Sequence, residues 1–148
     1  MNPYLLRAAD LGPKAVEKIL HLIPKELYDN PSADRFTVRE VLAHLADWEP
    51  IFRDRMVQAR LHPGCSVEVF DEGERAKEMA YGSQDVFTSL ETWAQERRKT
   101  IDFLRTLSND DFSKPLIHPE NGAMRLEDVA NMLLGHDLYH VEQLAEYL

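Results

Sequence analysis

Cysteine is nearly absent from this sequence, because Cys65 is the single thiol among 148 residues. One cysteine cannot form an intrachain disulfide, so an oxidising compartment would add nothing to stability. Long apolar runs are missing too, and no stretch approaches the roughly 20 residues that span a bilayer. The N-terminal residues lack the basic and apolar order of a secretion signal. We therefore expect a cytoplasmic protein without a membrane segment.

Basic residues are also scarce. Lys and Arg number 17 against 26 Asp and Glu, which gives a formal net charge of -9. Such a chain has no general attraction for phosphate backbones or anionic lipid, so we expect neither nucleic acid nor a membrane surface as a partner. The hydrophobic content of 44% is that of an ordinary globular protein, and the length suits one core. We predict a single domain over residues 1–148.

No stretch alternates apolar and polar residues as a half-buried strand does. Apolar residues instead recur at intervals of three and four, which is the spacing of an amphipathic helix. Four such segments with one shared core predict an all-α protein, a four-helix bundle. The predicted helices span residues 12–23, 37–60, 83–104 and 126–148.

Several residues predict where these helices begin and bend. Pro13 suits a first turn, so the first helix should begin near Gly12, with residues 3–10 as a short turn or a helical extension. Thr37 and Glu40 form a capping box at the second helix, and Pro50 is expected to kink it. Ser83 is the expected cap of the third helix. The intervening connection, residues 61–82, is long enough to cross the bundle and to hold a short helix.

Two histidines on the last predicted helix need an explanation. His136 and His140 are four residues apart on the apolar face that Leu133 and Leu144 also occupy. A buried imidazole without a partner costs about 1–3 kcal/mol, so both rings must be satisfied. A divalent metal ion would satisfy both, because this spacing lets two ring nitrogens reach one ion. His44, on the apolar face of the second helix, is the candidate third ligand.

A metal-free bundle remains the alternative, with the histidines hydrogen-bonded to carboxylates or carbonyl groups. Asp47 lies one turn after His44, so we predict that its carboxylate accepts a ligand N–H or acts as a base. We expect the other nearby acids, Glu49, Asp137 and Glu142, at the surface. Arg97 is also expected there, with the aliphatic part of its side chain packed against the protein and its guanidinium in water.

The remaining chemical groups have simpler explanations. His62 and His118 each precede a proline, so turn formation accounts for them. His21 has no partner at metal-binding spacing, and nothing beside Cys65 would activate its thiol. Trp48 and Trp93 are expected in the core.

Three segments resemble the DinB/YfiT-like superfamily of small bundle metalloproteins. They are FTVREVLAHLADWE at 36–49, GHDLYHVEQL at 135–144, and HPENG followed by RLEDV within 118–129. The resemblance implies a four-helix bundle with a long crossover connection, frequently as a homodimer. It also implies one divalent ion, nickel or zinc with manganese and iron as alternatives, held by His44, His136 and His140.

The resemblance further implies a metal-dependent enzyme acting on a small molecule. Three neutral imidazoles leave coordination positions open, and an ion in such a site can activate either water or a thiol. The preferred hypothesis is a transferase that uses a low-molecular-weight thiol cofactor, and a hydrolase is the alternative. A stress-related protein that binds metal without catalysis is a third hypothesis.

Overall fold

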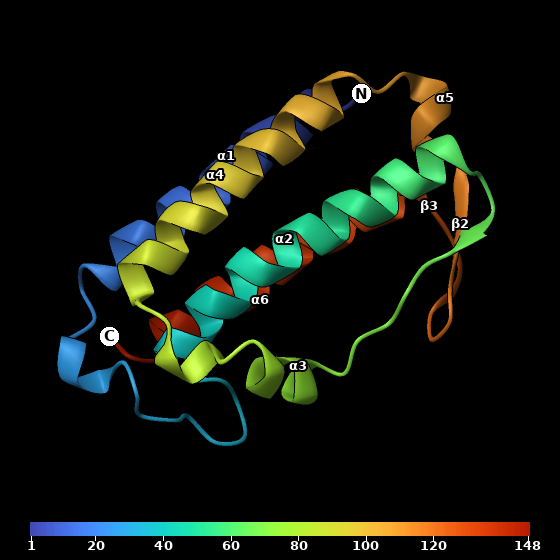
Figure 1. The fold of residues 1–148 in the computed structure, drawn as a ribbon. Helices are drawn as coiled ribbons and strands as arrows, with labels where there is room; N and C mark the ends of the chain where they lie inside the picture. The colour runs from blue at the N-terminus through green and yellow to red at the C-terminus, as the bar shows by residue number, and fades with distance from the viewer.

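The computed structural model describes all 148 residues, and four long helices form its body (Figure 1). Helix α1 packs against α4 and α6, and α2 packs against the same two helices. This arrangement confirms the predicted all-α four-helix bundle. No helix combines the length and the apolar character needed to cross a bilayer. The long helices are α1 (Pro3–Leu20), α2 (Val38–Leu61), α4 (Val86–Arg105) and α6 (Leu126–Ala145).

Shorter elements connect the long helices. The crossover connection between α2 and α4 runs along the side of α2 and α6 that faces away from α1 and α4, and α3 lies within it (Figure 1). The predicted short helix in this connection is therefore present. The connecting elements are η1 (Lys25–Leu27), β1 (Cys65–Ser66), α3 (Glu72–Glu78), η2 (Tyr81–Ser83), α5 (Asn109–Phe112), β2 (Pro115–His118) and β3 (Gly122–Arg125).

The bundle also carries a small sheet that the sequence pattern does not reveal. Strands β2 and β3 pair in antiparallel fashion, and β1 adds to β2 in parallel. The strands are only 2 or 4 residues long, which is too short for a period-two pattern to stand out from the sequence. This small sheet lies at one end of the bundle, beside the C-terminal end of α2 (Figure 1).

The structure revises two of the predicted helix starts. Helix α1 begins at Pro3, where the Asn2 side chain caps it by accepting the N–H of Tyr4, so residues 3–10 form the helical extension. Helix α4 is capped by Asp85 rather than by Ser83. The capping box at the start of α2 is confirmed, and this helix continues without a break through Pro50.

A buried polar layer separates two hydrophobic clusters in the core. Arg97 of α4 is 2% exposed and lies between two carboxylates, those of Glu49 on α2 and Asp137 on α6. The surface positions predicted for these three residues were therefore wrong, because ion pairing across helices allows charged groups to be buried. One cluster includes Leu20, Leu42 and Trp93, and the other includes Met56, Leu104 and Leu126.

Helix α1 joins this polar layer through its backbone. Pro13 lies inside α1 and has no N–H, so the carbonyl group of Ala9 loses its helical hydrogen-bond donor. The guanidinium of Arg97 donates to that carbonyl oxygen at 2.8 Å. One side chain of α4 therefore contacts each of the other three long helices.

Candidate metal centre

Three imidazoles meet where α2 and α6 pack together. The Nε2 atom of His136 lies 2.7 Å from Nε2 of His44 and 3.2 Å from Nε2 of His140. The three ligand atoms all lie within 4.8 Å of one another, and no Cys, Asp or Glu belongs to this group. His44 and His140 are buried, whereas His136 is only partly buried. The structure therefore brings together the three histidines that the sequence predicted as ligands.

The spacing of these nitrogens matches what a small divalent ion requires. Two nitrogens that share a tetrahedral ion at about 2.0–2.1 Å lie about 3.3 Å apart. The separation of 3.2 Å between Nε2 of His136 and Nε2 of His140 is close to that value, and the separation of 2.7 Å between Nε2 of His136 and Nε2 of His44 is shorter. Neutral imidazole is also a common ligand of zinc and nickel. The donor set therefore fits one ion with three nitrogen ligands.

A hydrogen bond to Gln143 orients the ring of His140. The side-chain amide of Gln143 donates to the carbonyl oxygen of Phe36 at 2.8 Å, which leaves its Oε1 atom to face Nδ1 of His140 at 2.9 Å. Because Oε1 can only accept, Nδ1 of a neutral His140 carries the proton. The lone pair then resides on Nε2, which points toward the other two histidines.

Aromatic side chains surround the other two ligands. The ring of His44 packs against Phe36, Trp48 and Tyr81, and that of His136 packs against Phe52. Burial lowers the pKa of His44 to about 2 and that of His136 to about 3, and it lowers the pKa of His140 to about 4. All three rings are therefore neutral near pH 7, which is the form that binds metal.

Replacing Gln143 with leucine should weaken metal binding about 10–100-fold, because Nδ1 of His140 would lose its acceptor. Gln143→Glu keeps an oxygen acceptor there and should retain most of the affinity. Competition with a chromophoric chelator measures both dissociation constants. Equal affinities for the leucine variant and the parent protein would show that this hydrogen bond does not support the ligand.

Asp47 does not contact the histidines through a hydrogen bond. Its carboxylate instead accepts hydrogen bonds from Arg75 and Tyr81, with an Arg75 Nη2 to Asp47 Oδ1 distance of 2.8 Å. Asp47 thereby ties α2 to α3 and η2 of the crossover connection. The sequence-based role for Asp47, as an acceptor for a ligand or as a base, remains a proposal.

A cavity of about 420 Å³ opens onto the histidines from the side of the crossover connection. His136 and His140 form part of its wall on α6, and Glu72 contributes from α3. No hydrogen bond or ion pair engages the Glu72 side chain, which is exposed. Desolvation by neighbouring groups together with the charge of Asp71 raises its pKa. Sequence analysis missed Glu72, because no spacing rule relates it to residues more than sixty positions away.

A family model shows to which superfamily the chain belongs. The model of the DinB superfamily matches residues 8–144, a span that includes all three histidines. The chain belongs to the DinB superfamily. This confirms the family resemblance that was based on the histidine-containing segments.

Similarity to individual DinB-like proteins extends over almost the whole chain. The protein "Putative metal-dependent hydrolase OB0782" of Oceanobacillus iheyensis is 23% identical over 144 residues, or 97% of this chain and 83% of that protein. The structure of YfiT from Bacillus subtilis, described as a probable metal-dependent hydrolase with an unusual four-helix bundle topology, matches with a TM-score of 0.90 at 20% identity. That match covers 97% of this chain and 83% of YfiT.

A longer structure shares the same fold. The mycothiol-dependent maleylpyruvate isomerase matches with a TM-score of 0.72 at 19% identity. The match covers 95% of this chain but only 59% of the isomerase, so the isomerase contains a substantial part with no counterpart here. At this identity the likeness establishes the fold alone.

Other candidates from the sequence lie outside the histidine cluster of this DinB chain. His118 is buried in β2, where its Nδ1 accepts the N–H groups of Glu120 and Asn121, so its predicted role in a turn is confirmed. His21 and His62 are exposed. Cys65 is a free thiol in β1. Both predicted core tryptophans, Trp48 and Trp93, are buried.

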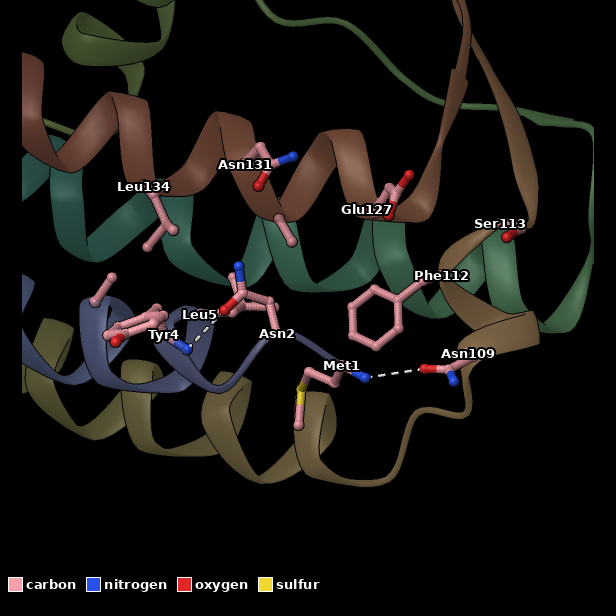
Figure 2. A pocket seen from close by; sticks show the side chains of 12 residues that line it. Met1, Asn2, Tyr4, Leu5, Asn109, Phe112, Ser113, Glu127, Asn131 and Leu134 are labelled. Atoms are coloured by element: carbon pink, nitrogen blue, oxygen red, sulfur yellow. Dashed lines mark hydrogen bonds between the residues drawn. The ribbon is translucent and has the colours of Figure 1, made fainter.

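A larger cavity, of about 550 Å³, lies among α1, α5 and α6. Figure 2 shows Phe112 and Leu134 at this cavity, with Asn131 and Glu127 of α6. The amino group of Met1 donates a hydrogen bond to the side chain of Asn109 there. No histidine lines it. The smaller cavity beside His136 and His140 is therefore the one associated with the metal centre of this DinB-family protein.

Proposed function

We propose that this chain is a metal-dependent enzyme in which His44, His136 and His140 hold one divalent ion. The observation that supports this proposal is the convergence of three neutral Nε2 atoms beside an open cavity. Nickel and zinc are the first choices for the ion, with manganese and iron as alternatives. When bound, such an ion would supply Lewis-acid activation of water or a thiol.

Hydrolysis of a small molecule is the first candidate reaction. Two relatives that each match 97% of this chain are named or described as metal-dependent hydrolases. The histidine group also contains no carboxylate or thiolate, so three protein ligands leave room for a reactant from the cavity. A structural site would instead be closed by a fourth protein ligand.

Glu72 is our candidate for the proton-transferring group. It lines the same cavity as His136 and His140 and lacks a competing ion pair. A carboxyl group with a raised pKa can take up and release a proton more readily near neutral pH. Asp47 is less suited to this role, because Arg75 and Tyr81 already occupy its carboxylate.

Transfer of a thiol is the second candidate reaction, because the mycothiol-dependent isomerase shares the fold. The charges around the cavity favour a thiol without net negative charge. Asp34 and Glu72 line it, while the guanidinium of Arg35 is already paired with Glu142 and Glu146. An anionic thiol cofactor would therefore meet unpaired carboxylates on entering.

The metal site can be tested by composition. We expect about one ion per chain in untagged protein reconstituted with nickel, zinc or manganese, and little in His140→Ala or His44→Ala. His21→Ala and His62→Ala are matched controls, because both histidines are exposed and lie outside the cluster. Plasma mass spectrometry measures the content. Undiminished metal in both ligand variants would disprove the assignment, and no metal in any form would favour a metal-free bundle.

The reaction class can be tested with two sets of probes on the loaded protein. Aryl esters report hydrolysis, whereas a neutral thiol supplied with an aryl halide reports thiol transfer. Glu72→Gln should lower the turnover number with little change in metal content, and Glu74→Gln is the control on the same helix. Turnover in neither assay, with metal bound, would favour a binding protein without catalysis.

A further inference from the structure

Arg55 is a buried cation without an anionic partner. It lies on α2 with 6% of its surface exposed, and no carboxylate forms an ion pair with it. Its Nη2 atom donates to the backbone oxygen of Glu68 at 2.9 Å, while its buried Nε atom has no hydrogen-bond partner. Burial also lowers the pKa of this guanidinium. An uncompensated buried charge is strongly disfavoured, so this group needs an acceptor.

The lack of a partner does not reflect a shortage of carboxylates. The chain has 26 acidic residues against 17 basic ones. Every other buried or half-buried arginine is ion-paired with at least one of them. Those arginines are Arg35, Arg39, Arg53, Arg60, Arg75 and Arg97.

A cavity of about 390 Å³ lies beside Arg55, between α2 and the first part of the crossover connection. Ile51, Val67 and Phe70 form an apolar part of its wall, and most of the other lining residues are polar. The guanidinium carbon of Arg55 lies 5.6 Å from the ring centroid of Trp48, and this contact restrains the plane of the guanidinium. The cavity thus combines a restrained, incompletely satisfied cation with a small apolar patch.

We propose that this cavity binds the carboxylate group of a small, otherwise apolar carboxylic acid. The planar guanidinium matches a carboxylate in shape. Its Nη1 group makes no hydrogen bond within the chain and retains access to solvent, so it can donate a charge-assisted hydrogen bond to a carboxylate in the cavity. Asp54 and Glu68 also line the cavity, and both are exposed. Their charges disfavour a polyanion such as a phosphate ester, so a single carboxylate is the better match.

The carboxylate site is distinct from the metal centre. Arg55 follows His44 by 11 residues on one helix, which corresponds to a separation of about 16 Å along the axis. None of the three histidines lines the cavity beside Arg55. The inference therefore does not depend on the proposed metal-dependent function, and either can fail without the other.

Benzoate is the probe, and benzamide is its neutral counterpart. We expect benzoate, titrated to about 10 mM into the ¹⁵N-labelled full chain, to give a saturable shift of the Arg55 Nε–H signal in nuclear magnetic resonance spectra. Benzamide should bind at least about 10-fold more weakly, because it lacks the charge. The Nε–H signal is assigned by its loss in Arg55→Met, a substitution that removes an uncompensated charge and should fold.

Backbone signals of Val67 and Phe70 report on the cavity in every variant. In Arg55→Met, benzoate should bind at least about 10-fold more weakly, whereas Arg53→Met should keep the parental affinity, because Arg53 pairs with Glu96 and lies outside the cavity. Equal binding of benzamide, equal binding of sulfate, or no saturable shift would overturn the proposal. Shifts confined to residues around His136 and His140 would also overturn it, because they would place the carboxylate at the metal.

Discussion

Arg97→Met is expected to lower the free energy of unfolding by about 3–5 kcal/mol. The guanidinium donates to Glu49 at 2.7 and 2.8 Å, to Asp137 at 2.6 and 2.8 Å, and to the carbonyl oxygen of Ala9 at 2.8 Å. Its removal would leave two carboxylates buried together without a cation and one carbonyl group without a donor. Urea unfolding of metal-free protein measures the loss.

Arg98→Met is the matched control, because Arg98 follows Arg97 in α4 but is exposed. Its effect should stay within about 0.5 kcal/mol. Neutralising both acids in the Arg97→Met background, with Glu49→Gln and Asp137→Asn, should recover part of the lost stability, because no unpaired charge remains. If Arg97→Met cost less than about 1 kcal/mol, the polar layer would contribute little to the fold.

Gly12→Ala should lower the free energy of unfolding by about 1–3 kcal/mol or more, although alanine is ordinarily the better residue in a helix. A Cβ atom at position 12 would come within 2.3 Å of Asp137 Oδ2 and 3.0 Å of Arg97 Nη1. These atoms are held by buried ion pairs, so they cannot move aside without breaking them. Urea unfolding in the presence of a chelator measures the change.

Gly135→Ala is the control for this substitution. Gly135 lies inside α6, and a Cβ atom there would meet nothing within 4 Å. This variant should gain about 0.5–1 kcal/mol from the reduced backbone entropy of the unfolded chain. The prediction for Gly12 would be contradicted if both alanine variants gained stability.

The polar layer also bears on the metal centre. Asp137 directly follows His136 on α6, and Glu49 lies just over one turn after His44 on α2. Through Arg97, these two acids hold α2 and α6 in a defined register. The three ligands come from the same two helices, so this register also determines how closely their Nε2 atoms approach.

Several features of this protein could be derived from sequence alone, because they depend on geometry within one helix. The interval of four residues places His136 and His140 on one face, and the Thr37–Glu40 pair marks the start of α2. Apolar residues at intervals of three and four indicated a helical bundle. Hydrogen bonds between residues near in sequence impose this periodicity, so it can be recognised in the sequence without a tertiary structure.

The meeting of His44 with His136, across 92 residues, was decided by packing. Packing also decided that Arg97 is buried between two carboxylates and that Arg55 forms an ion pair with no carboxylate. A charged residue on a helix looks the same in sequence whether it faces water or an oppositely charged group on another helix. Sequence periodicity determined the helices and the faces that they present. Only tertiary contacts determined which polar groups became partners, because burial and pairing depend on both helices at once.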